Sequence, residues 1–375
     1  MDRAGPNPLP SRRGVILGGA ALLGAAVPLA GTARATAPPE TGWVDVPVPP
    51  LTGQRPLLGI AAPDPWHVFA GGAENANQPD QRAVMLHRTP RGWTRAVLPE
   101  GLTIVNDVRA RHAADAWALA AAAEAQERTD LLHWNGRRWT TVPGPAGERL
   151  YAIDLDRTGA LWATGIGEGG TTVSVRRRHG PWTNTLTLPE LHGLNAIAAG
   201  SRSDVWVGGM GESSTAPTPL WHFDGTDWTR VMWEGTTYAH WILQIEYVAP
   251  DDVWFYAIEQ HPLFRPPTLH HWNGSAFTVH PLPERTAAAG EVRPRSVTGF
   301  LGSLASDGRG GVWLSYSFDP TYLLHFDGGS WTLVSPPVPT AAYSMARVPH
   351  TTTVWAGTQR GTVWRHSTRP SPRPQ

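Results

Sequence analysis

Tryptophan recurs along this chain at a nearly constant interval, and this periodicity constrains the fold more than any other feature. The chain has 375 residues and 19 Trp, and seven short apolar segments each carry one Trp, spaced by 51, 45, 44, 48, 59 and 42 residues. A fixed period of this size indicates a repeat architecture in which each repeat is one supersecondary unit. The seven positions are Trp66, Trp117, Trp162, Trp206, Trp254, Trp313 and Trp355.

A second signature follows most of these Trp residues and predicts a hairpin. It consists of an apolar pair, a His, an aromatic residue, a turn containing Gly and a further aromatic residue, as in Leu132-His133-Trp134-Asn135-Gly136 followed by Trp139. Asn-Gly and Asp-Gly supply the positive φ angles that a tight hairpin requires. Each repeat therefore contains an inner strand, the Trp strand, the His strand and an outer strand.

Four short strands in about 45 residues is the unit of a β-propeller. Seven such units predict an all-β fold, a seven-bladed β-propeller. The last repeat begins near Tyr343 and lacks an outer strand, whereas Gly42-Trp43-Val44-Asp45-Val46-Pro47 is similar to the outer strands of other repeats. We therefore expect this N-terminal strand to complete the C-terminal blade, closing one propeller domain over residues 42–368 and leaving no exposed sheet edge at the junction.

The ends of the chain carry features unrelated to the repeats. Ser11-Arg12-Arg13 precedes a weakly apolar stretch and an Ala33-Arg34-Ala35 cleavage pattern, which predicts a cleaved twin-arginine signal peptide over residues 1–35. The stretch is shorter than the roughly 20 apolar residues of a spanning helix, so we expect no stable membrane span. Residues 36–41 are interpreted as a linker and 369–375 as a disordered tail. The predicted location is secreted or extracytoplasmic.

The composition removes several classes of chemistry. The chain has no Cys, and all 31 basic residues are Arg, which excludes disulfides, thiolate metal ligands, cysteine nucleophiles and Schiff-base lysines. Without residues 1–35, 27 Arg face 30 acidic residues, a net charge of −3. A nucleic-acid-binding protein needs a basic face or arm. We therefore expect no nucleic-acid partner.

Two repeats carry motifs of known propeller families. Val205-Trp206-Val207-Gly208-Gly209, with Phe223 and Trp228 downstream, resembles a kelch repeat. Residues 156–162 resemble the D-x-x-G-x-L-W unit of regulator-type propellers. The resemblance extends over the chain after residue 35 and implies a seven-bladed propeller. Its motifs are structural, and the absence of cysteine excludes the Cys-linked Tyr of kelch-type copper oxidases.

The repeated aromatic and His residues are interpreted as structural. We expect both sets of repeated Trp to lie in the core, namely the seven above together with Trp43, Trp93, Trp139, Trp182, Trp228 and Trp331. Equivalent positions in different blades cannot converge on one metal ion at about 2 Å. The repeated His residues are therefore expected to satisfy neighbouring strands, and they are His87, His133, His222, His271 and His325.

Candidate ligand-binding residues are placed on the loops that follow the Trp strands, because these loops and the connections between blades gather on one face of a propeller. Acidic residues recur there, beginning with Glu74, and residues 233–241 and 259–265 add aromatic, His and Arg side chains outside the repeated positions. Such groups suit sugar stacking or peptide capture. The candidates are Glu168, Glu212, Tyr238, His240, Trp241, Glu259, His261, Arg265 and Tyr322.

These features predict an exported, monomeric binding or interaction module for extracellular glycan, peptide, protein or cell-envelope material. The alternative is a polysaccharide lyase or glycoside hydrolase that uses carboxylates and His on the same face. A purely structural secreted protein is a third interpretation. No cofactor is expected, with a divalent cation on the carboxylates left open. The insertion at residues 284–295 is interpreted either as a lid or as a disordered segment.

Overall fold

The structure is a computed structural model. It describes residues 42–122, 125–177, 180–189, 193–210, 220–232, 240–259, 267–283, 303–316 and 322–367, with only the backbone at 125–128. The predicted signal peptide, linker, C-terminal tail and the insertion at 284–295 lie outside the described residues. No helix in these ranges is long and apolar enough to cross a membrane.

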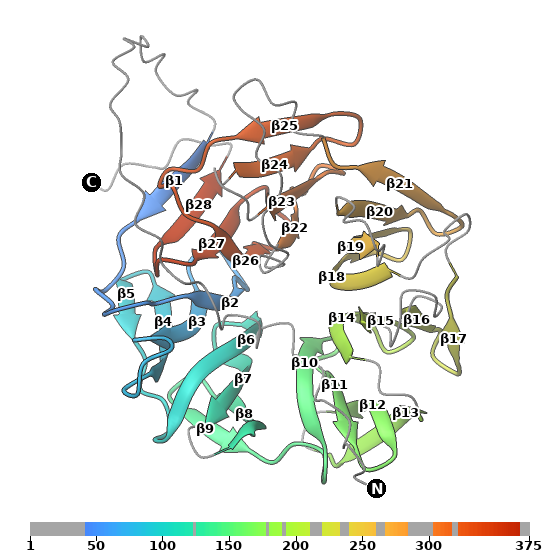
Figure 1. The fold of residues 1–375 in the computed structure, drawn as a ribbon, viewed down its shortest axis with the longest axis horizontal. Coiled ribbons are helices and arrows are strands. Elements are labelled where there is room, and N and C mark those ends of the chain that lie inside the picture. The colour runs from blue at the N-terminus through green and yellow to red at the C-terminus, as the bar shows by residue number, and fades with distance from the viewer. Residues whose placement is uncertain are drawn as a thin grey trace, which may run out of the picture.

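The described strands form seven four-stranded antiparallel sheets arranged as blades around a central axis (Figure 1). Blade I contains β2 (Leu57–Ala61), β3 (Val68–Glu74), β4 (Arg82–Thr89) and β5 (Gly92–Arg95). Blade II contains β6 (Leu102–His112), β7 (Asp115–Ala122), β8 (Ala125–Trp134) and β9 (Trp139–Val142). Blade III contains β10 (Arg149–Leu155), β11 (Leu161–Gly167), β12 (Gly170–Arg176) and β13 (Trp182–Leu188). Blade IV contains β14 (Gly193–Ser201), β15 (Asp204–Met210), β16 (Leu220–Phe223) and β17 (Trp228–Arg230).

The remaining blades follow the same order from the axis outward. Blade V contains β18 (His240–Ala249), β19 (Asp252–Glu259), β20 (Thr268–Trp272) and β21 (Phe277–Pro281). Blade VI contains β22 (Leu304–Ser306), β23 (Val312–Tyr316), β24 (Tyr322–Phe326) and β25 (Trp331–Val334). Blade VII contains β26 (Ala342–Arg347), β27 (Val354–Thr358), β28 (Val363–Ser367) and β1 (Gly42–Val46). The predicted seven-bladed β-propeller is confirmed.

The hydrophobic core lies between the blades. Trp162 of blade III, which is fully buried, packs in one cluster with Val205, Val207 and Phe223 of blade IV. The sequence of a strand that is buried on both faces is a nearly continuous run of apolar residues, because neither face meets water. Each blade thus depends on its neighbours to bury its faces.

A repeated side-chain group ties the second strand of a blade to its third strand. In blade IV, the His222 ring stacks on Trp206 at a centroid distance of 4.2 Å, and His222 Nε2 lies 2.8 Å from Asp204 Oδ1. The same arrangement recurs in Asp115–Trp117–His133, Asp252–Trp254–His271 and Asp307–Trp313–His325. Four of the five repeated His side chains are held in this way within their own blades, whereas His87 stacks on Phe69 and also meets the Trp134 ring of blade II.

Blade I departs from the predicted register. Phe69, not Trp66, pairs with His87 and stacks on it at 4.3 Å, in the place that Trp117 takes opposite His133. Trp66 is 57% exposed, so its assignment to the core is wrong. The error arises because Trp66 lies in the turn before β3, three residues ahead of the equivalent core position.

Two substitutions test this register. Phe69→Ala removes a fully buried aromatic ring and is expected to lower the free energy of unfolding by about 3–5 kcal/mol. Trp66→Ala removes a larger but exposed side chain and is expected to change it by no more than about 0.5 kcal/mol. Urea unfolding of both variants measures the difference. A larger loss for Trp66→Ala than for Phe69→Ala would contradict the assignment.

The glycine pairs Gly71-Gly72 of blade I and Gly208-Gly209 of blade IV have a packing cause. A Cβ atom on Gly72 would overlap the carbonyl oxygen of Pro56, and one on Gly209 would overlap that of Gly193. A Cβ on Gly208 would lie 2.8 Å from the Ile242 side chain of the next blade. Glycine is needed here because the inner strand and the next blade approach the backbone closely.

The N-terminal strand completes the seventh blade. β1 pairs antiparallel with β28 from Gly42 opposite Ser367 to Val46 opposite Val363, and Figure 1 shows the blue β1 beside the red strands β26 to β28. Trp43 is 7% exposed and meets the ring of Trp313 in blade VI edge to face at 5.3 Å. Strand β1 thus contributes both backbone pairing and core packing at the junction of the chain ends.

Candidate ligand-binding face

We call one side of the disc the rim face. It carries the loops between the second and third strands of the blades and the connections from each outer strand to the next inner strand, such as the turn between β11 and β12 and residues 143–148 between β9 and β10. Of the predicted acidic series, the described members Glu74, Glu168 and Glu259 lie at this face, but Glu74 is not a surface group. Glu74 is fully buried and accepts hydrogen bonds from Arg95, from Arg82 Nε at 2.9 Å and from Thr52 N at 2.9 Å. Burial alone would raise the Glu74 pKa, but these hydrogen bonds lower it below its ordinary value.

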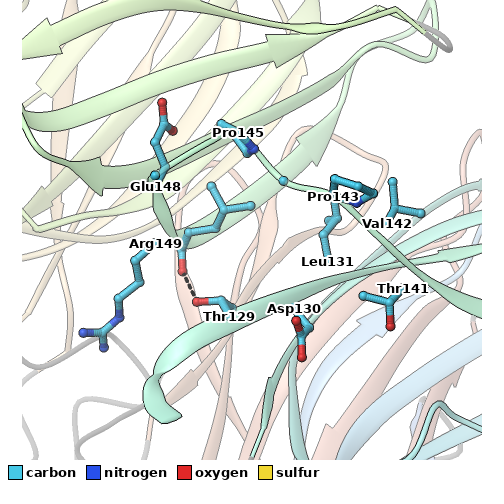
Figure 2. A pocket seen from close by; sticks show the side chains of 12 residues that line it. Thr129, Asp130, Leu131, Thr141, Val142, Pro143, Pro145, Glu148 and Arg149 are labelled. Carbon is cyan, nitrogen blue, oxygen red and sulfur yellow. Dashed lines mark hydrogen bonds between the residues drawn. The ribbon is translucent and has the colours of Figure 1, made fainter.

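A pocket of about 630 Å³ opens on the rim face between blades II and III. Figure 2 shows Glu148 and Arg149 on one side of it and Thr141, Val142 and Pro143 on the other. Its lining mixes apolar residues with charged and hydroxyl groups, and its volume falls within the range of small-molecule sites. The lining residues are Thr129, Asp130, Leu131, Thr141, Val142, Pro143, Gly144, Pro145, Gly147, Glu148, Arg149 and Leu150.

The polar side chains of this pocket are held by neighbouring strands. Glu148 accepts hydrogen bonds from Thr172 Oγ1 at 2.8 Å and from Ser174 Oγ at 3.1 Å, both on β12. Thr129 Oγ1 donates to the carbonyl oxygen of Leu150 at 2.9 Å, which joins β8 to β10. The Arg149 guanidinium lies over the Tyr151 ring at 5.5 Å. Burial raises the Tyr151 pKa above its ordinary value, and Arg149 opposes that shift.

The predicted residue Glu168 lies in the same region. It is exposed in the turn between β11 and β12, and a Cβ atom on the adjacent Gly167 would lie 3.4 Å from the Glu148 side chain. Sequence reasoning found Glu168 but missed Asp130, Glu148 and Arg149. The segment Pro143-Gly144-Pro145-Ala146-Gly147-Glu148, a Pro- and Gly-rich connection ending in a carboxylate, was the available signal.

Three other predicted residues are brought together in blade V. His240 lies opposite Glu259, and Trp241 lies opposite Ile258, in the pairing of β18 with β19. His240 is buried, and its ring lies 5.3 Å from that of His270 on β20, which sequence reasoning missed. Burial lowers the His270 pKa to about 3, with a further contribution from His240. The Trp241 side chain packs against the core between blades V and VI.

The other candidates are dispersed or lie outside the described residues. Tyr322 begins β24 in blade VI and is half-buried. Glu212, Tyr238, His261 and Arg265 lie outside the described residues. Within the described ranges, no group of three or more His, Cys, Asp or Glu side chains is arranged to hold a metal ion.

A charged cluster lies on the inner strands near the axis, and we call it the axial cluster. Arg109 Nη1 of β6 lies 2.7 Å from Asp107 Oδ1, and Arg109 Nε lies 3.2 Å from Asp154 Oδ1 of β10. Glu246 of β18 accepts a hydrogen bond from Ser306 N at 2.9 Å. Burial raises the Glu246 pKa to about 7 and also raises that of Asp154, although Arg109 opposes the Asp154 shift. The cluster comprises Asp107, Arg109, Asp154 and Glu246.

The protein is thus a seven-bladed β-propeller whose rim face has a pocket at the junction of blades II and III. No protein-family model and no curated protein matches this sequence. Solved structures share its fold. YCF48 bound to a D1 peptide matches with TM-score 0.59 and 14% identity, over 88% of this chain and 95% of that one.

Two enzymes also share the architecture. A catalytically inactive virginiamycin B lyase from Staphylococcus aureus with quinupristin matches with TM-score 0.59 and 13% identity, over 88% of this chain and 100% of that one. The GH74 xyloglucanase from Xanthomonas campestris matches with TM-score 0.60 and 12% identity, over 89% of this chain and 55% of that one. At this identity the likeness shows the fold alone. The regulator-type and kelch resemblances remain sequence observations.

Proposed function

We propose that the protein is an exported propeller that binds an extracellular glycan or peptide on the rim face, with the pocket between blades II and III as its principal site. The observation that carries the proposal is a cavity of about 630 Å³ whose wall combines Pro143 and Pro145 with the charged groups Asp130, Glu148 and Arg149. The apolar residues offer contact area to a ligand, and charges of both signs orient its donors and acceptors. The export part of the proposal rests on residues 1–35.

Ligand screening and two pocket variants test this site. A thermal-shift series with peptide and envelope-polysaccharide panels should reveal a stabilising ligand, since binding at 100 times Kd adds about 2.7 kcal/mol to the native state. Asp130→Asn and Arg149→Gln are then expected to weaken that ligand by about tenfold each, because each removes a charged hydrogen-bonding group. Titration calorimetry measures the loss.

The control is Arg137→Gln, an exposed arginine in the hairpin at the other end of β8 and β9. It should bind the ligand with unchanged affinity. Wild-type affinity in both pocket variants would remove the pocket from the proposal. An EDTA arm with added Ca²⁺, Mg²⁺ or Zn²⁺ tests the divalent cation, which remains a prediction.

A polysaccharide lyase or glycoside hydrolase is the second candidate, favoured by the placement of His240 opposite Glu259 beside His270. General acid–base catalysis works best with a pKa near the working pH. The buried His270 has a pKa of about 3 and is therefore neutral at a working pH near 7. His240 and Glu259 would then have to carry the proton transfers. Release of reducing or unsaturated sugar ends that Glu259→Gln abolishes would establish an enzyme and displace the binding proposal.

A further inference from the structure

The outer strand of blade II stops short of the strand that it covers. The pairing of β9 with β8 ends where Val142 lies opposite Leu131, and Thr129 of β8 has no strand partner on that side among the described residues. In blade III, the equivalent residue Thr171 is paired with Leu188 of the outer strand β13. Blade II therefore has a gap at the place where blade III has an outer strand.

The connection from β9 to β10 is held on blade III, away from β8. The carbonyl oxygen of Pro143 accepts a hydrogen bond from Trp182 Nε1 of blade III at 3.1 Å. At the other end of the connection, Glu148 is bonded to two hydroxyl groups of β12. The pocket lies between this connection and the uncovered part of β8, and Figure 2 shows Thr129 and Pro145 on different sides of it.

The backbone of Thr129 directs its hydrogen-bonding groups into the gap. Asn135 N donates to the carbonyl oxygen of Arg138 across the hairpin, so the backbone groups of Asn135 point to the β9 side of β8. Backbone groups of alternate residues in a strand point to the same side, and the pairing of β8 is regular over residues 129–134. The N–H and C=O of Thr129 therefore face the position of a further outer strand. Such uncovered groups are a template for pairing with another chain.

The neighbouring side chains would form an apolar surface under a strand bound there. Residues directly opposite each other in an antiparallel pair place their side chains on the same face of the sheet. The Thr129 side chain faces blade III, where Oγ1 donates to the carbonyl oxygen of Leu150. Leu131 packs with Leu150 in the core between blades II and III, and a Cβ atom on Gly144 would lie 3.6 Å from Leu150 Cδ1. A residue bound opposite Thr129 would therefore direct its side chain toward Leu150 and the connection.

We propose that the pocket binds an extended peptide as a short outer strand of blade II, and that one apolar residue of the peptide exchanges two backbone hydrogen bonds with Thr129. The inference rests on the proposed function and names peptide, not glycan, as the ligand class. Each peptide residue carries one N–H donor and one C=O acceptor, which is the pair that Thr129 requires, whereas a sugar ring carries hydroxyl groups without that arrangement. In strand addition, main-chain bonds give affinity and side-chain pockets give specificity.

The first test changes the ligand and leaves the protein intact. A library of acetylated and amidated heptapeptides is screened against the purified protein, and the tightest-binding peptide is synthesised again with an N-methyl group on each backbone nitrogen in turn. Methylation of the residue opposite Thr129 should weaken binding by about tenfold or more, because it removes the donor and fills the gap with a methyl group. Methylation of the adjacent residues, whose N–H groups point away from β8, should weaken it by less than about twofold. Titration calorimetry measures the series.

The second test changes the protein. Thr129→Pro removes an N–H that makes no bond within the sheet, and proline is accepted at such edge positions, so the melting temperature should stay close to that of wild type. The affinity for the selected heptapeptide should fall by about tenfold. The matched control is Ala83→Pro, at the equivalent position of β4 in blade I. It should bind the heptapeptide within about twofold of wild type.

The possible outcomes separate this inference from the proposed function. An equal loss at every position of the N-methyl series, or wild-type affinity in Thr129→Pro, would overturn the pairing with β8. If oligosaccharides bind and are weakened by Arg149→Gln while no heptapeptide binds, the peptide assignment is wrong and the pocket remains the site of the proposed function. Binding of neither class would overturn both. If Thr129→Pro melts far below Ala83→Pro, the N-methyl series decides by itself.

Discussion

A chain that begins at Pro47, and so lacks β1, is expected to lose the cooperative unfolding transition of the intact ring and to aggregate. Without β1, the strand β28 becomes an exposed edge with unpaired backbone groups, which invites pairing with other chains. The truncation also removes Trp43 from its contact with Trp313 across blades VI and VII. Calorimetry and light scattering of this chain, beside one that begins at Thr41, measure the effect.

A point substitution separates the two contributions of β1. Trp43→Ala keeps the backbone pairing of Gly42–Val46 but deletes the buried ring, and should cost about 3–5 kcal/mol while the protein stays monomeric. Aggregation of this variant to the same extent as the truncated chain would mean that side-chain packing, not edge closure, protects the ring. An unchanged melting temperature after truncation would show that β1 is not part of the closed blade.

The second large effect is expected in the axial cluster. Arg109→Leu leaves Asp107 and Asp154 without the cation that they contact at 2.7 and 3.2 Å. The Arg109 and Asp154 side chains are only partly buried, so the expected loss lies between that of a surface pair and that of a fully buried pair, at about 1–3 kcal/mol. Denaturant unfolding at pH 8 measures the loss. The control Arg137→Leu, at an exposed hairpin, should lie within about 0.5 kcal/mol of wild type.

The loss should depend on pH in a defined direction. Burial raises the pKa of Glu246 to about 7 and also raises that of Asp154. A carboxyl whose pKa is raised in the folded state binds protons more tightly there. Its stabilising contribution is therefore complete at a pH below its pKa in the unfolded chain, and it is lost as the pH rises through its pKa in the folded protein. Arg109→Leu should therefore be closest to wild type near pH 4–5 and furthest above pH 7. A constant difference across that range would contradict the electrostatic origin.

The fold was predictable because its signal repeats. The Trp strand and the His hairpin recur in nearly every blade, and each copy buries the same kind of side chain at the same place, as in the stacking of His222 on Trp206. Blade I is the exception. Trp66 matched the spacing, but β3 begins at Val68, and only the pairing of Phe69 with His87 identifies the residue that fills the core.

The candidate site was predicted less well because it is formed by contacts between blades. Glu168 was found from its place after a Trp strand, whereas Glu148 is positioned by Thr172 and Ser174 on another strand. The axial cluster shows the same limit. Arg109 and Asp154 are 45 residues apart, and no local pattern indicates that inner strands of two blades place them in contact. Spacing identifies a repeat, but it does not show which irregular residues of different repeats meet.

The pairing of the two chain ends also sets an order of events during synthesis. Gly42 pairs with Ser367, so β1 leaves the ribosome about 325 residues before its partner exists. At about 5–20 residues per second, it waits on the order of 15 to 65 s, while blades I to VI can already pack on one another. The ring therefore closes only after β28 has been synthesised, and until then β1 is an unpaired strand that must be kept from other chains.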